Sequence, residues 1–267
     1  MRRIVITIGY VGSNYGGWQV QPNRDTVQAR VEAALLALTG VQTSVVASGR
    51  TDAGVHAIGQ VAHFDTPVSI PAKNFVRGLN RFLPPDIRVT KAEERDENFH
   101  ARFSAHEKTY RYVLYLSKTE NALLYDRAWR IDYPLDADKM REAAEYLVGE
   151  HDFASFVSSG ADTKTTVRNV KSISVVKRGK EIRLTFTANG FLYNMVRLMT
   201  GAIVLAGSGK IEPEEVKRML EAKSKTAVTN VAPACGLYLV KVKYPPLSRK
   251  ESDFCAALVD TRAPKSV

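Results

Sequence analysis

Apolar residues along this chain recur with two different spacings, which predict strands and helices in mixed order. Alternating or densely apolar runs, typical of strands, occupy ranges 3–9, 42–47, 58–64 and 86–93. Apolar residues three and four apart predict helices over ranges 27–39 and 71–83. The first part of the chain is therefore predicted to run strand–helix–strand–strand–helix–strand.

The two predicted helices of this part carry recognisable signals. Asp25-Thr26-Val27-Gln28 is similar to a capping box at the start of the first helix, and Gly40 is a typical stop. The second helix is amphipathic, with Phe75, Leu79 and Phe82 predicted inward and Arg77 and Arg81 outward.

The second part of the chain has a similar mix of elements. Strands are predicted over ranges 108–116, 128–133, 170–176, 181–188 and 236–242, and helices over 138–148, over 191–206 and after Pro213. A basic turn at 177–180 separates two of the strands, which predicts a hairpin. This mixture predicts an α+β fold with a largely antiparallel sheet.

Composition narrows the class of protein. The chain has 267 residues, 45% of them hydrophobic, with a net charge of +10 and a pI of about 9.6. An excess of Lys and Arg favours a polyanionic partner, nucleic acid above all, although basic charge can also serve solubility alone. Two distant cysteines, Cys235 and Cys255, predict neither a disulfide framework nor a zinc site, and they favour a reducing cytoplasm.

The sequence contains no segment typical of targeting or of a membrane span. Its first residues lack the long apolar core of a signal peptide. The most apolar stretch, 191–206, is too short to cross a membrane and contains Asn194 and Arg197. We therefore expect a cytoplasmic protein that does not insert into a membrane.

The stretch that most strongly suggests chemistry is the loop predicted between the second and third strands, residues 47–57. Gly49 and Gly54 bracket Arg50 and Asp52. A carboxylate on a short loop between two buried strands is rigidly mounted, which suits catalysis. Asp followed closely by Gly is also typical of a plain turn, so both interpretations stand at this point.

Four blocks in fixed order resemble the signatures of the TruA-type tRNA pseudouridine synthases. They are Arg50-Thr51-Asp52-Ala53-Gly54-Val55-His56, Phe99-His100-Ala101-Arg102-Phe103-Ser104-Ala105, Tyr110-Arg111-Tyr112 and Phe191-Leu192-Tyr193-Asn194-Met195-Val196-Arg197. Four ordered blocks are more specific than any one of them. The resemblance implies the pseudouridine synthase fold, in which two α/β halves join through a central, mostly antiparallel sheet with a cleft between them.

The resemblance also implies a division of the chain. The N-terminal half, 1–105, would carry the Asp52 loop, and the C-terminal half would comprise 106–246. Residues 247–267 are polar, lack periodicity and match no part of the family, so a disordered tail is expected.

The resemblance assigns roles to two charged residues. The family's match to Asp52 is the nucleophile, and its match to Arg197 pairs with that aspartate; a cation within about 4–6 Å keeps a carboxylate ionised. Arg197 also stands out by itself, because a guanidinium in an apolar helix cannot lose its charge and needs an anion or water. A structural salt bridge or a narrow exposed stripe would satisfy it equally.

Arg50 lies two residues from Asp52, and in an extended loop such residues point to the same side. In the family, the matching arginine helps to extrude the base. Sharing the pairing with Asp52 and holding a phosphate are two further roles open to Arg50.

Tyr110 lies on a predicted strand, where ordinary sheet packing would explain it. The family's matching tyrosine stacks on the target base, which must leave its RNA stack to reach the aspartate. Phe191 and Leu192, at the start of the predicted apolar helix, are expected to line the same pocket. Basic residues are expected to contact phosphates, among them Arg24, Arg102, Lys108, Arg111 and Arg168, along with Arg77, Arg81, Lys164 and Lys180.

Together these features predict a tRNA pseudouridine synthase, an isomerase acting on uridines 38, 39 and 40 of the anticodon stem-loop. Isomerisation needs neither oxidation nor water, and the five scattered histidines form no ligand motif, so no cofactor or metal is expected. The resemblance implies a homodimer with tRNA across both subunits. Two alternatives remain: a non-catalytic RNA-binding module, and a synthase of the same fold that acts on ribosomal RNA.

Overall fold

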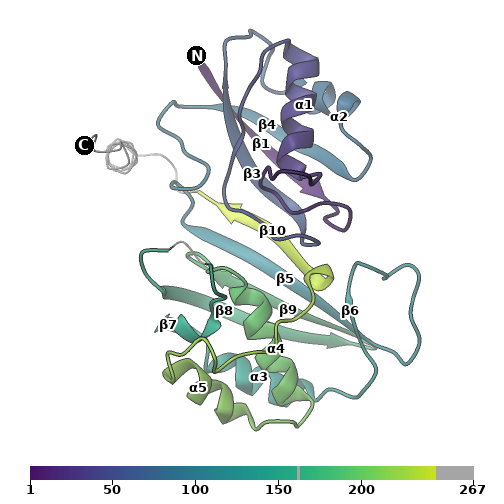
Figure 1. The fold of residues 1–267 in the computed structure, drawn as a ribbon, viewed down its shortest axis with the longest axis vertical. Helices are drawn as coiled ribbons and strands as arrows, with labels where there is room; N and C mark the ends of the chain where they lie inside the picture. The colour runs from purple at the N-terminus through teal and green to yellow at the C-terminus, as the bar shows by residue number, and fades with distance from the viewer. Residues whose placement is uncertain (161–162, 245–267) are drawn as a thin grey trace. The chain divides into compact units, whose positions relative to one another are not determined.

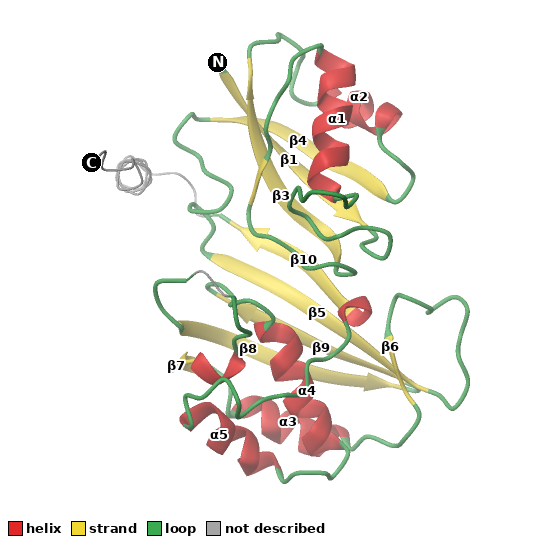
Figure 2. Cartoon of the chain, viewed as in Figure 1, coloured by secondary structure: helices red, strands yellow, loops and turns green. Residues whose placement is uncertain are grey.

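The chain folds into two compact units, which are drawn in Figure 1. The computed structural model describes residues 1–160 and 163–244, so the predicted tail at 247–267 lies outside the described residues. Unit 1 comprises Met1–His106 and the segment that begins at Lys241, and unit 2 comprises Glu107–Val240. Each unit combines helices with strands, as Figure 2 shows by colour.

Unit 1 is a sheet with two helices. Its elements follow the predicted order: β1 (Arg2–Tyr10), α1 (Val27–Thr39), β2 (Val46–Ala47), β3 (His56–Thr66), α2 (Asn74–Phe82) and β4 (Ile87–Arg95). The strands lie in the order β4–β1–β3, with β2 on β3, and these pairings are antiparallel.

Alternation along β1 decides which face of this sheet the helices cover. Ile4, Ile6 and Ile8 are fully buried, and Ile4 lies opposite Phe64 of β3. The ring of Phe64 packs against Phe75 of α2, with centroids 5.4 Å apart. The isoleucine face is therefore the face under the helices, and burying it drives the packing of this unit.

The ends of α1 differ in detail from the prediction. Thr26 is the N-cap, one residue later than a capping box at 25–28 requires, and its side chain accepts a hydrogen bond from the N–H of Ala29. Gln28 instead bonds to the backbone of Val20 and Val45. The predicted stop is confirmed, because Gly40 adopts φ 70° and its N–H bonds to the last turn.

Two further predictions for unit 1 are wrong in part. The strand predicted over 42–47 is reduced to Val46–Ala47, because the backbone of Val45 is bonded by the α1 side chains Glu32 and Gln28. Phe82, predicted inward, is 45% exposed. The helix ends at this residue, and the buried Leu83 fills the interior beyond it.

Unit 2 is also α+β. Its strands are β5 (Glu107–Leu116), β6 (Trp129–Ile131), β7 (Gly149–Asp152), β8 (Val167–Arg178) and β9 (Glu181–Ala188). Its helices are α3 (Ala137–Glu145), α4 (Met195–Gly207) and α5 (Pro213–Glu221), with short 3₁₀ turns at Ala154–Phe156 and Ala234–Gly236. The strands lie in the order β5–β9–β8–β7 with antiparallel pairing, and β6 joins β5 in parallel.

The mostly antiparallel α+β architecture that the sequence predicts is confirmed, with shifted boundaries. The predicted hairpin is present, since β8 and β9 are joined at Gly179, which has φ 58°. The helix predicted from residue 191 begins only at Met195, because Asn194 adopts a left-handed conformation with φ 59° that interrupts a helix. The last strand, β10 (Leu237–Lys243), runs from unit 2 into unit 1.

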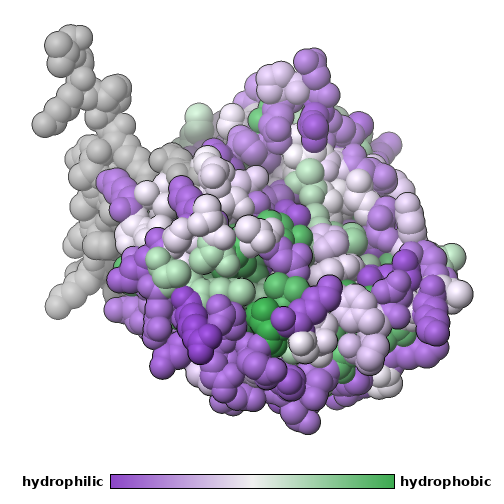
Figure 3. Space-filling view, turned by 60° about the horizontal axis from the view of Figure 1, so that its bottom comes forward, coloured by the Kyte–Doolittle hydropathy of each residue, from purple (hydrophilic) through white to green (hydrophobic). Residues whose placement is uncertain are grey.

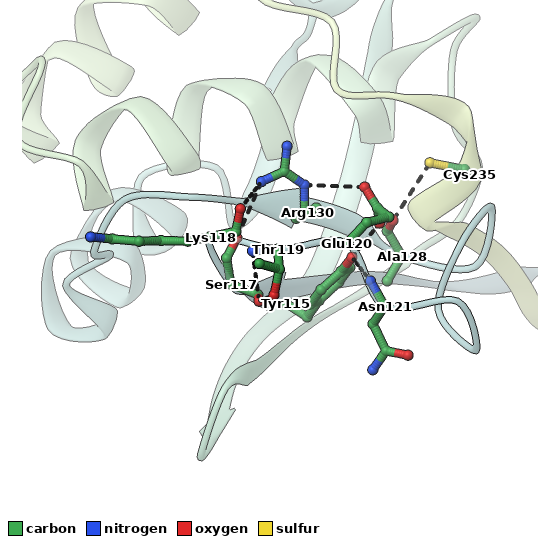
Figure 4. A network of polar contacts seen from close by, with 9 residues as sticks. All are labelled: Tyr115, Ser117, Lys118, Thr119, Glu120, Asn121, Ala128, Arg130 and Cys235. Atoms are coloured by element: carbon green, nitrogen blue, oxygen red, sulfur yellow. Dashed lines mark hydrogen bonds and ion pairs between the residues drawn. The ribbon is translucent and has the colours of Figure 1, made fainter.

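The connection from β5 to β6 is anchored by polar contacts, which Figure 4 shows. The hydroxyl of Tyr115 donates to one oxygen of Glu120, and Nε of Arg130 donates to the other at 3.1 Å. At the other end, the thiol of Cys235 donates to the carbonyl of Ala128 at 3.7 Å. Hydrogen bonds therefore hold both ends of this long connection in place.

The surface of the molecule is mainly polar where Figure 3 views it. Hydrophilic residues cover most of this face, and hydrophobic residues gather in a limited central area. The large apolar residues are concentrated inside the two units, where many have no exposed surface at all. Burial of these side chains supplies most of the free energy that holds each unit together.

Candidate active site

Asp52 lies on the loop that connects β2 to β3 in unit 1. The two flanking strands pair with each other, with Val46 opposite His63 and Ala47 opposite Ala62. Both ends of the loop are therefore fixed to the same sheet. This is a short, doubly anchored mount for a carboxylate.

Buried polar side chains hold the start of the loop. Ser48 is fully buried; its N–H donates to the carbonyl of Val61 at 2.7 Å, and its hydroxyl donates to Gln60 Oε1 at 2.7 Å. The amide of Gln60, also fully buried, donates to the carbonyl of Gly49 at 2.8 Å. One glutamine thus satisfies both a hydroxyl and a backbone carbonyl that would otherwise be costly to bury.

The glycine-containing stretch after β1 packs directly against the same loop. The N–H of Trp18 donates to the carbonyl of Thr51 at 3.0 Å. Gly17 has φ 97°, and a Cβ on it would lie 2.6 Å from the Thr51 carbonyl oxygen and 3.1 Å from the carbonyl carbon of Asp52. Only glycine tolerates both this conformation and this approach.

A second close contact lies at the other end of the loop. A Cβ on Gly12 would be 2.0 Å from the carbonyl oxygen of Val55, and the Gly12 N–H donates to Nδ1 of the buried His56 at 3.0 Å. Because Nδ1 accepts this bond, a neutral His56 ring carries its proton on Nε2. The two loops are therefore interlocked at both Gly12 and Gly17.

Tyr10, the last residue of β1, adds a side-chain contact to the interlock. Its hydroxyl lies 2.8 Å from the hydroxyl of Thr51, and its ring packs against Trp18 with centroids 6.1 Å apart. Burial raises the pKa of Tyr10 to about 12, so the hydroxyl stays neutral at physiological pH.

These contacts leave successive residues of the loop with different exposure. Thr51 is buried, whereas Asp52 is half-buried and Arg50 is exposed. The N–H of Val55 donates to the carbonyl of Asp52 at 3.1 Å, and Gly54 has φ 79°. The loop is therefore a tight turn and a rigid mount at once, so the two interpretations of the sequence do not exclude each other.

Tyr110 lies on β5 in unit 2, opposite Phe186 of β9. The edge of one ring meets the face of the other where Tyr110 contacts Phe191, with centroids 5.1 Å apart and planes at 84°. Phe191 is half-buried, and Leu192 is almost fully buried. Both residues precede α4 rather than starting it, which corrects the predicted helix.

Arg197 lies in the first turn of α4, and not in the middle of an apolar helix as predicted. Its half-buried guanidinium donates to the carbonyl of Ala232 at 2.7 Å and to Oδ1 of Asn194 at 2.8 Å. The amide of Asn194 in turn donates to the hydroxyl of Ser158 at 3.0 Å. These bonds hold the guanidinium in a defined orientation.

The segment that holds Arg197 is packed closely on α4. A Cβ on Gly201 would lie 1.9 Å from the carbonyl oxygen of Asn230, so only glycine permits this approach. The N–H of Ala232 donates to the carbonyl of Arg197 at 3.2 Å. Backbone and side chain of Arg197 are thus both bonded to the same residue.

Within each unit the structure gathers part of the predicted site. Arg50 and Asp52 share one loop of unit 1. Tyr110, Phe191, Leu192 and Arg197 belong to unit 2, where Tyr110 and Phe191 are in contact.

The predicted phosphate-binding residues are spread over both units. Arg24 and Arg102 are exposed residues of unit 1, and the guanidinium of Arg102 lies 5.7 Å from the centroid of the Phe103 ring. Lys108, Arg111 and Arg168 are half-buried residues of unit 2. Burial lowers the pKa of Arg168, whose guanidinium donates to the carbonyls of Thr165 and Val167.

The two cations of β5 point in different directions. Successive residues of a strand face opposite sides of the sheet, so Lys108 shares the face of Tyr110 and Arg111 does not. In register, Arg111 lies opposite Thr185, while Tyr110 lies opposite the buried Phe186. Lys108 is therefore the cation of β5 that lies on the same side of the sheet as Tyr110.

The sequence alone assigned no individual role to the residues that hold the candidate side chains. In unit 1 these are Tyr10, Gly12, Gly17, Trp18 and Gln60. A signal for them existed, because Gln60 is a polar residue within an apolar strand, and glycines next to aromatic residues often mark a close backbone approach. In unit 2, the role of Asn194 follows from its left-handed conformation, which sequence alone rarely reveals.

Neither a metal-binding cluster nor a membrane-spanning helix occurs among the described residues. Within 1–160 and 163–244, no three His, Cys, Asp or Glu side chains gather in a way that would hold a metal ion. In the same ranges, every helix is too short or too polar to span a bilayer.

A family model described as tRNA pseudouridine synthase matches residues 6–104 and 143–245, most of the chain. The chain belongs to the tRNA pseudouridine synthase family. The matched segments include Asp52 with its loop and the stretch from Phe191 to Arg197, whereas Tyr110 lies between them. Membership in this family makes the chain an isomerase, as the sequence predicts.

Individual members of the tRNA pseudouridine synthase family are similar over nearly the whole chain. A protein of Caldicellulosiruptor bescii named tRNA pseudouridine synthase A is 44% identical over 244 residues, covering 91% of this chain and 100% of its own length. The protein of that name from Bacillus subtilis is 46% identical and covers 91% of this chain and 99% of its own. A crystal structure of a Cbf5-Nop10-Gar1 complex aligns with 88% of this chain and 57% of its own at 11% identity, but its TM-score of 0.34 is too low to inform the fold.

Proposed function

We propose that this chain isomerises uridine to pseudouridine in tRNA, with Asp52 as the nucleophile. The observation that carries the proposal is the mount of Asp52, a half-buried carboxylate on a loop interlocked with a second loop at Gly12 and Gly17. A plain turn on the surface has no need of such closely fitted contacts. A catalytic carboxylate does, because a small displacement of a reacting group can lower the rate a hundredfold.

The reaction exchanges one glycosidic bond for another. The N1–C1′ bond of uridine breaks, the base turns, and a C5–C1′ bond forms; C5 then loses its proton and N1 ends with one. Carboxylates form covalent intermediates at glycosidic carbons, which supports attack at C1′. Attack at C6 of the base and assistance to glycal formation are two other routes, and all three require an ionised Asp52.

Arg197 is proposed to supply the charge that keeps Asp52 ionised, with Arg50 assisting. An opposite charge within about 4–6 Å lowers the pKa of a carboxyl group. The support is the preparation of Arg197 for such a role, since Ala232 and Asn194 orient its guanidinium. Arg50 is exposed two residues from Asp52, where it can reach the RNA backbone or help to displace the base.

Tyr110 and Phe191 are proposed to receive the base after it leaves the RNA stack. An aromatic face compensates the lost stacking of a flipped base. The edge-to-face contact between the two rings supports this role, because it fixes the orientation of Tyr110. Leu192, almost fully buried, would form the floor beside Phe191 rather than contact the base directly.

The substrate is proposed to be the anticodon stem-loop of tRNA, at positions 38, 39 and 40. The names of the similar proteins include tRNA, and the net charge of +10 suits a polyanion. Arg24, Arg102, Lys108, Arg111 and Arg168 would contact phosphates. We also propose that the enzyme acts in the cytoplasm as a homodimer with tRNA lying across both subunits, and that it uses no cofactor or metal.

Tritium release tests the proposed function. The enzyme is incubated with bulk tRNA and, separately, with ribosomal RNA, both carrying uridine tritiated at C5, because pseudouridine formation expels that atom. We expect release from bulk tRNA and from a single transcribed tRNA, and loss of release from that transcript when its uridines 38, 39 and 40 are replaced by cytidine. Release from ribosomal RNA alone would establish the rRNA alternative, and release from neither would favour the non-catalytic binding module.

A further inference from the structure

The two helices of unit 1 form a groove on their outer side that the proposed chemistry does not use. It has a volume of about 1170 Å³. It lies between the end of α1 and the exposed side of α2, whose positions Figure 1 shows. Its lining includes Leu38, Asn74, Arg77, Gly78, Arg81 and Phe82.

The groove is a fixed feature of the unit. A Cβ on Gly78 would lie 2.8 Å from a methyl group of Leu38. The glycine therefore allows α2 to approach α1 closely at the bottom of the groove. Asn80 ties α2 to β4, since its side chain both donates to and accepts from the backbone of Val89 at 2.8 Å. The side chains on the outer face of α2 are therefore displayed from a rigid helix.

The charge of the groove is strictly positive. Arg77 and Arg81 are four residues apart on α2, so they lie on the same face of the helix, and both are exposed. Among the described residues that line the groove, none is acidic, and α2 itself contains no Asp or Glu. Two exposed arginines elsewhere in the chain, Arg30 and Arg218, each lie in an ion pair with a carboxylate. The two arginines of the groove are thus available to an external anion.

Phe82 gives the groove an aromatic surface as well. The amphipathic pattern predicted this residue inside, yet 45% of it is exposed. The guanidinium of Arg81 lies 5.9 Å from the centroid of the Phe82 ring, within the range of a cation–π contact. An exposed aromatic ring beside arginines is the combination with which proteins bind nucleic-acid strands, through stacking and phosphate contacts.

We propose that this groove is a second RNA-binding site, which holds the backbone of the tRNA at a distance from the reacting uridine. Arg77 and Arg81 contact phosphates, and the ring of Phe82 packs against a base or sugar. The proposal rests on the proposed function for the identity of the RNA. Val27 bonds to Gly17 beside the Asp52 loop, and Ala37 lines the groove, so α1 spans about 15 Å between the two sites at 1.5 Å per residue. An RNA stem bound at Asp52 would extend that far.

Titration of tRNA against the enzyme at several salt concentrations tests the proposal. The double variant Arg77→Gln/Arg81→Gln is compared with wild type, and Arg218→Gln is the matched control, because that arginine is 75% exposed but paired with Glu215. We expect the double variant to weaken binding about tenfold or more and to reduce the slope of log Kd against log salt by one to two, about 0.9 for each lost phosphate contact. The control should match wild type.

A second variant and a second readout separate binding from catalysis and from folding. Phe82→Leu keeps an apolar side chain but lacks a ring, so binding should weaken about fivefold or more. At tRNA concentrations below Kd, the rate of tritium release should fall in the groove variants by the same factor as the affinity for tRNA, whereas Arg218→Gln should release tritium at the wild-type rate. All variants should retain the melting temperature of wild type.

Three outcomes would overturn the inference. The first is a double variant whose Kd and salt slope match those of Arg218→Gln. The second is a lower single-turnover rate with unchanged binding. The third is a changed oligomeric state in sedimentation without a change in Kd, which would make the groove a protein contact. Absence of tritium release from wild type would instead refute the proposed function, while the binding titration would still report on the groove.

Discussion

The backbone N–H of Trp18 donates a 3.0 Å hydrogen bond to the carbonyl of Thr51, the residue that precedes Asp52. This bond is the centre of an interlock between the segment after β1 and the loop between β2 and β3. The interlock depends on two glycines, because a Cβ on Gly12 or Gly17 would overlap the backbone of the other loop. The position of the carboxylate is therefore determined by residues more than 30 positions earlier in the chain.

The interlock predicts that Gly17→Ala impairs catalysis beyond its effect on stability. The new methyl group would meet the Thr51 carbonyl at 2.6 Å in a backbone conformation with φ 97°, so the Asp52 loop must move. We expect kcat/KM for tritium release to fall roughly a hundredfold, in line with the cost of a small displacement of a reacting group.

A glycine elsewhere in unit 1 provides the control for this variant. Gly40 also has positive φ, 70°, but a Cβ there would meet nothing within 4 Å. Gly40→Ala should lower the free energy of unfolding by about 1 kcal/mol and leave kcat/KM unchanged. Equal kinetic losses in the two variants would show that the close approach at Gly17 has no special role.

The hydrogen bond between Tyr10 and Thr51 predicts a modest cost for Tyr10→Phe. The change leaves the buried Thr51 hydroxyl without this partner at 2.8 Å. We expect the free energy of unfolding to fall by about 1 kcal/mol, measured by urea denaturation. Tyr125→Phe, at a tyrosine that is 62% exposed, should have no measurable effect. A Tyr10→Phe variant as stable as wild type would count against the contact.

His63 predicts a pH dependence of stability. Burial and, next, the nearby His100 lower its pKa from 6.5 to about 4 in the folded protein. Between these two values the unfolded chain binds the proton and the folded chain does not, so stability is lost as the pH falls from about 6.5 towards 4. The loss attributable to His63 is at most about 3 kcal/mol.

Denaturation in urea at a series of pH values checks this assignment. His63→Gln keeps an acceptor for the N–H of Ala101, which bonds to Nδ1 of His63 at 3.2 Å, and removes the titrating ring. The free energy of unfolding of this variant should change less between pH 6.5 and 4 than that of wild type. If both proteins lose stability equally over this interval, another group is responsible.

Asn194 predicts that the orientation of Arg197 matters for the rate. Asn194→Gly tolerates the left-handed φ of 59° but removes the amide that accepts from the Arg197 guanidinium. We expect kcat to fall about tenfold with little change in melting temperature. Asn194→Ala should lose stability in addition, because alanine disfavours that conformation. An unchanged kcat in Asn194→Gly would remove Asn194 from the positioning of Arg197.

The fold was predictable from sequence where local pattern and tertiary packing agree. The period of two along β1 and the stop of α1 at Gly40 mark elements that the structure contains. The prediction failed where long-range contacts intervene. The side chain of Glu32 in α1 accepts a hydrogen bond from the N–H of Val45, which shortens β2. The left-handed conformation of Asn194 delays the start of α4.

The candidate site was predictable to a similar extent. The candidate side chains Asp52, Arg50, Tyr110 and Arg197 were predicted through blocks of sequence that resemble a family. The residues that support them were not, because Gly17 and Gln60 act through contacts with chain segments far away in sequence. Such contacts produce no periodic pattern in the local sequence. The only signals for them are a glycine, or a polar residue within an apolar strand.

The most direct test of the account is the single-turnover rate of Asp52→Asn on tRNA tritiated at C5 of uridine. The substitution keeps the shape of the side chain and removes its charge. We expect tRNA affinity within about twofold of wild type and a rate at least roughly a thousandfold lower. A variant that releases tritium at the wild-type rate would contradict the assignment of Asp52 as the nucleophile.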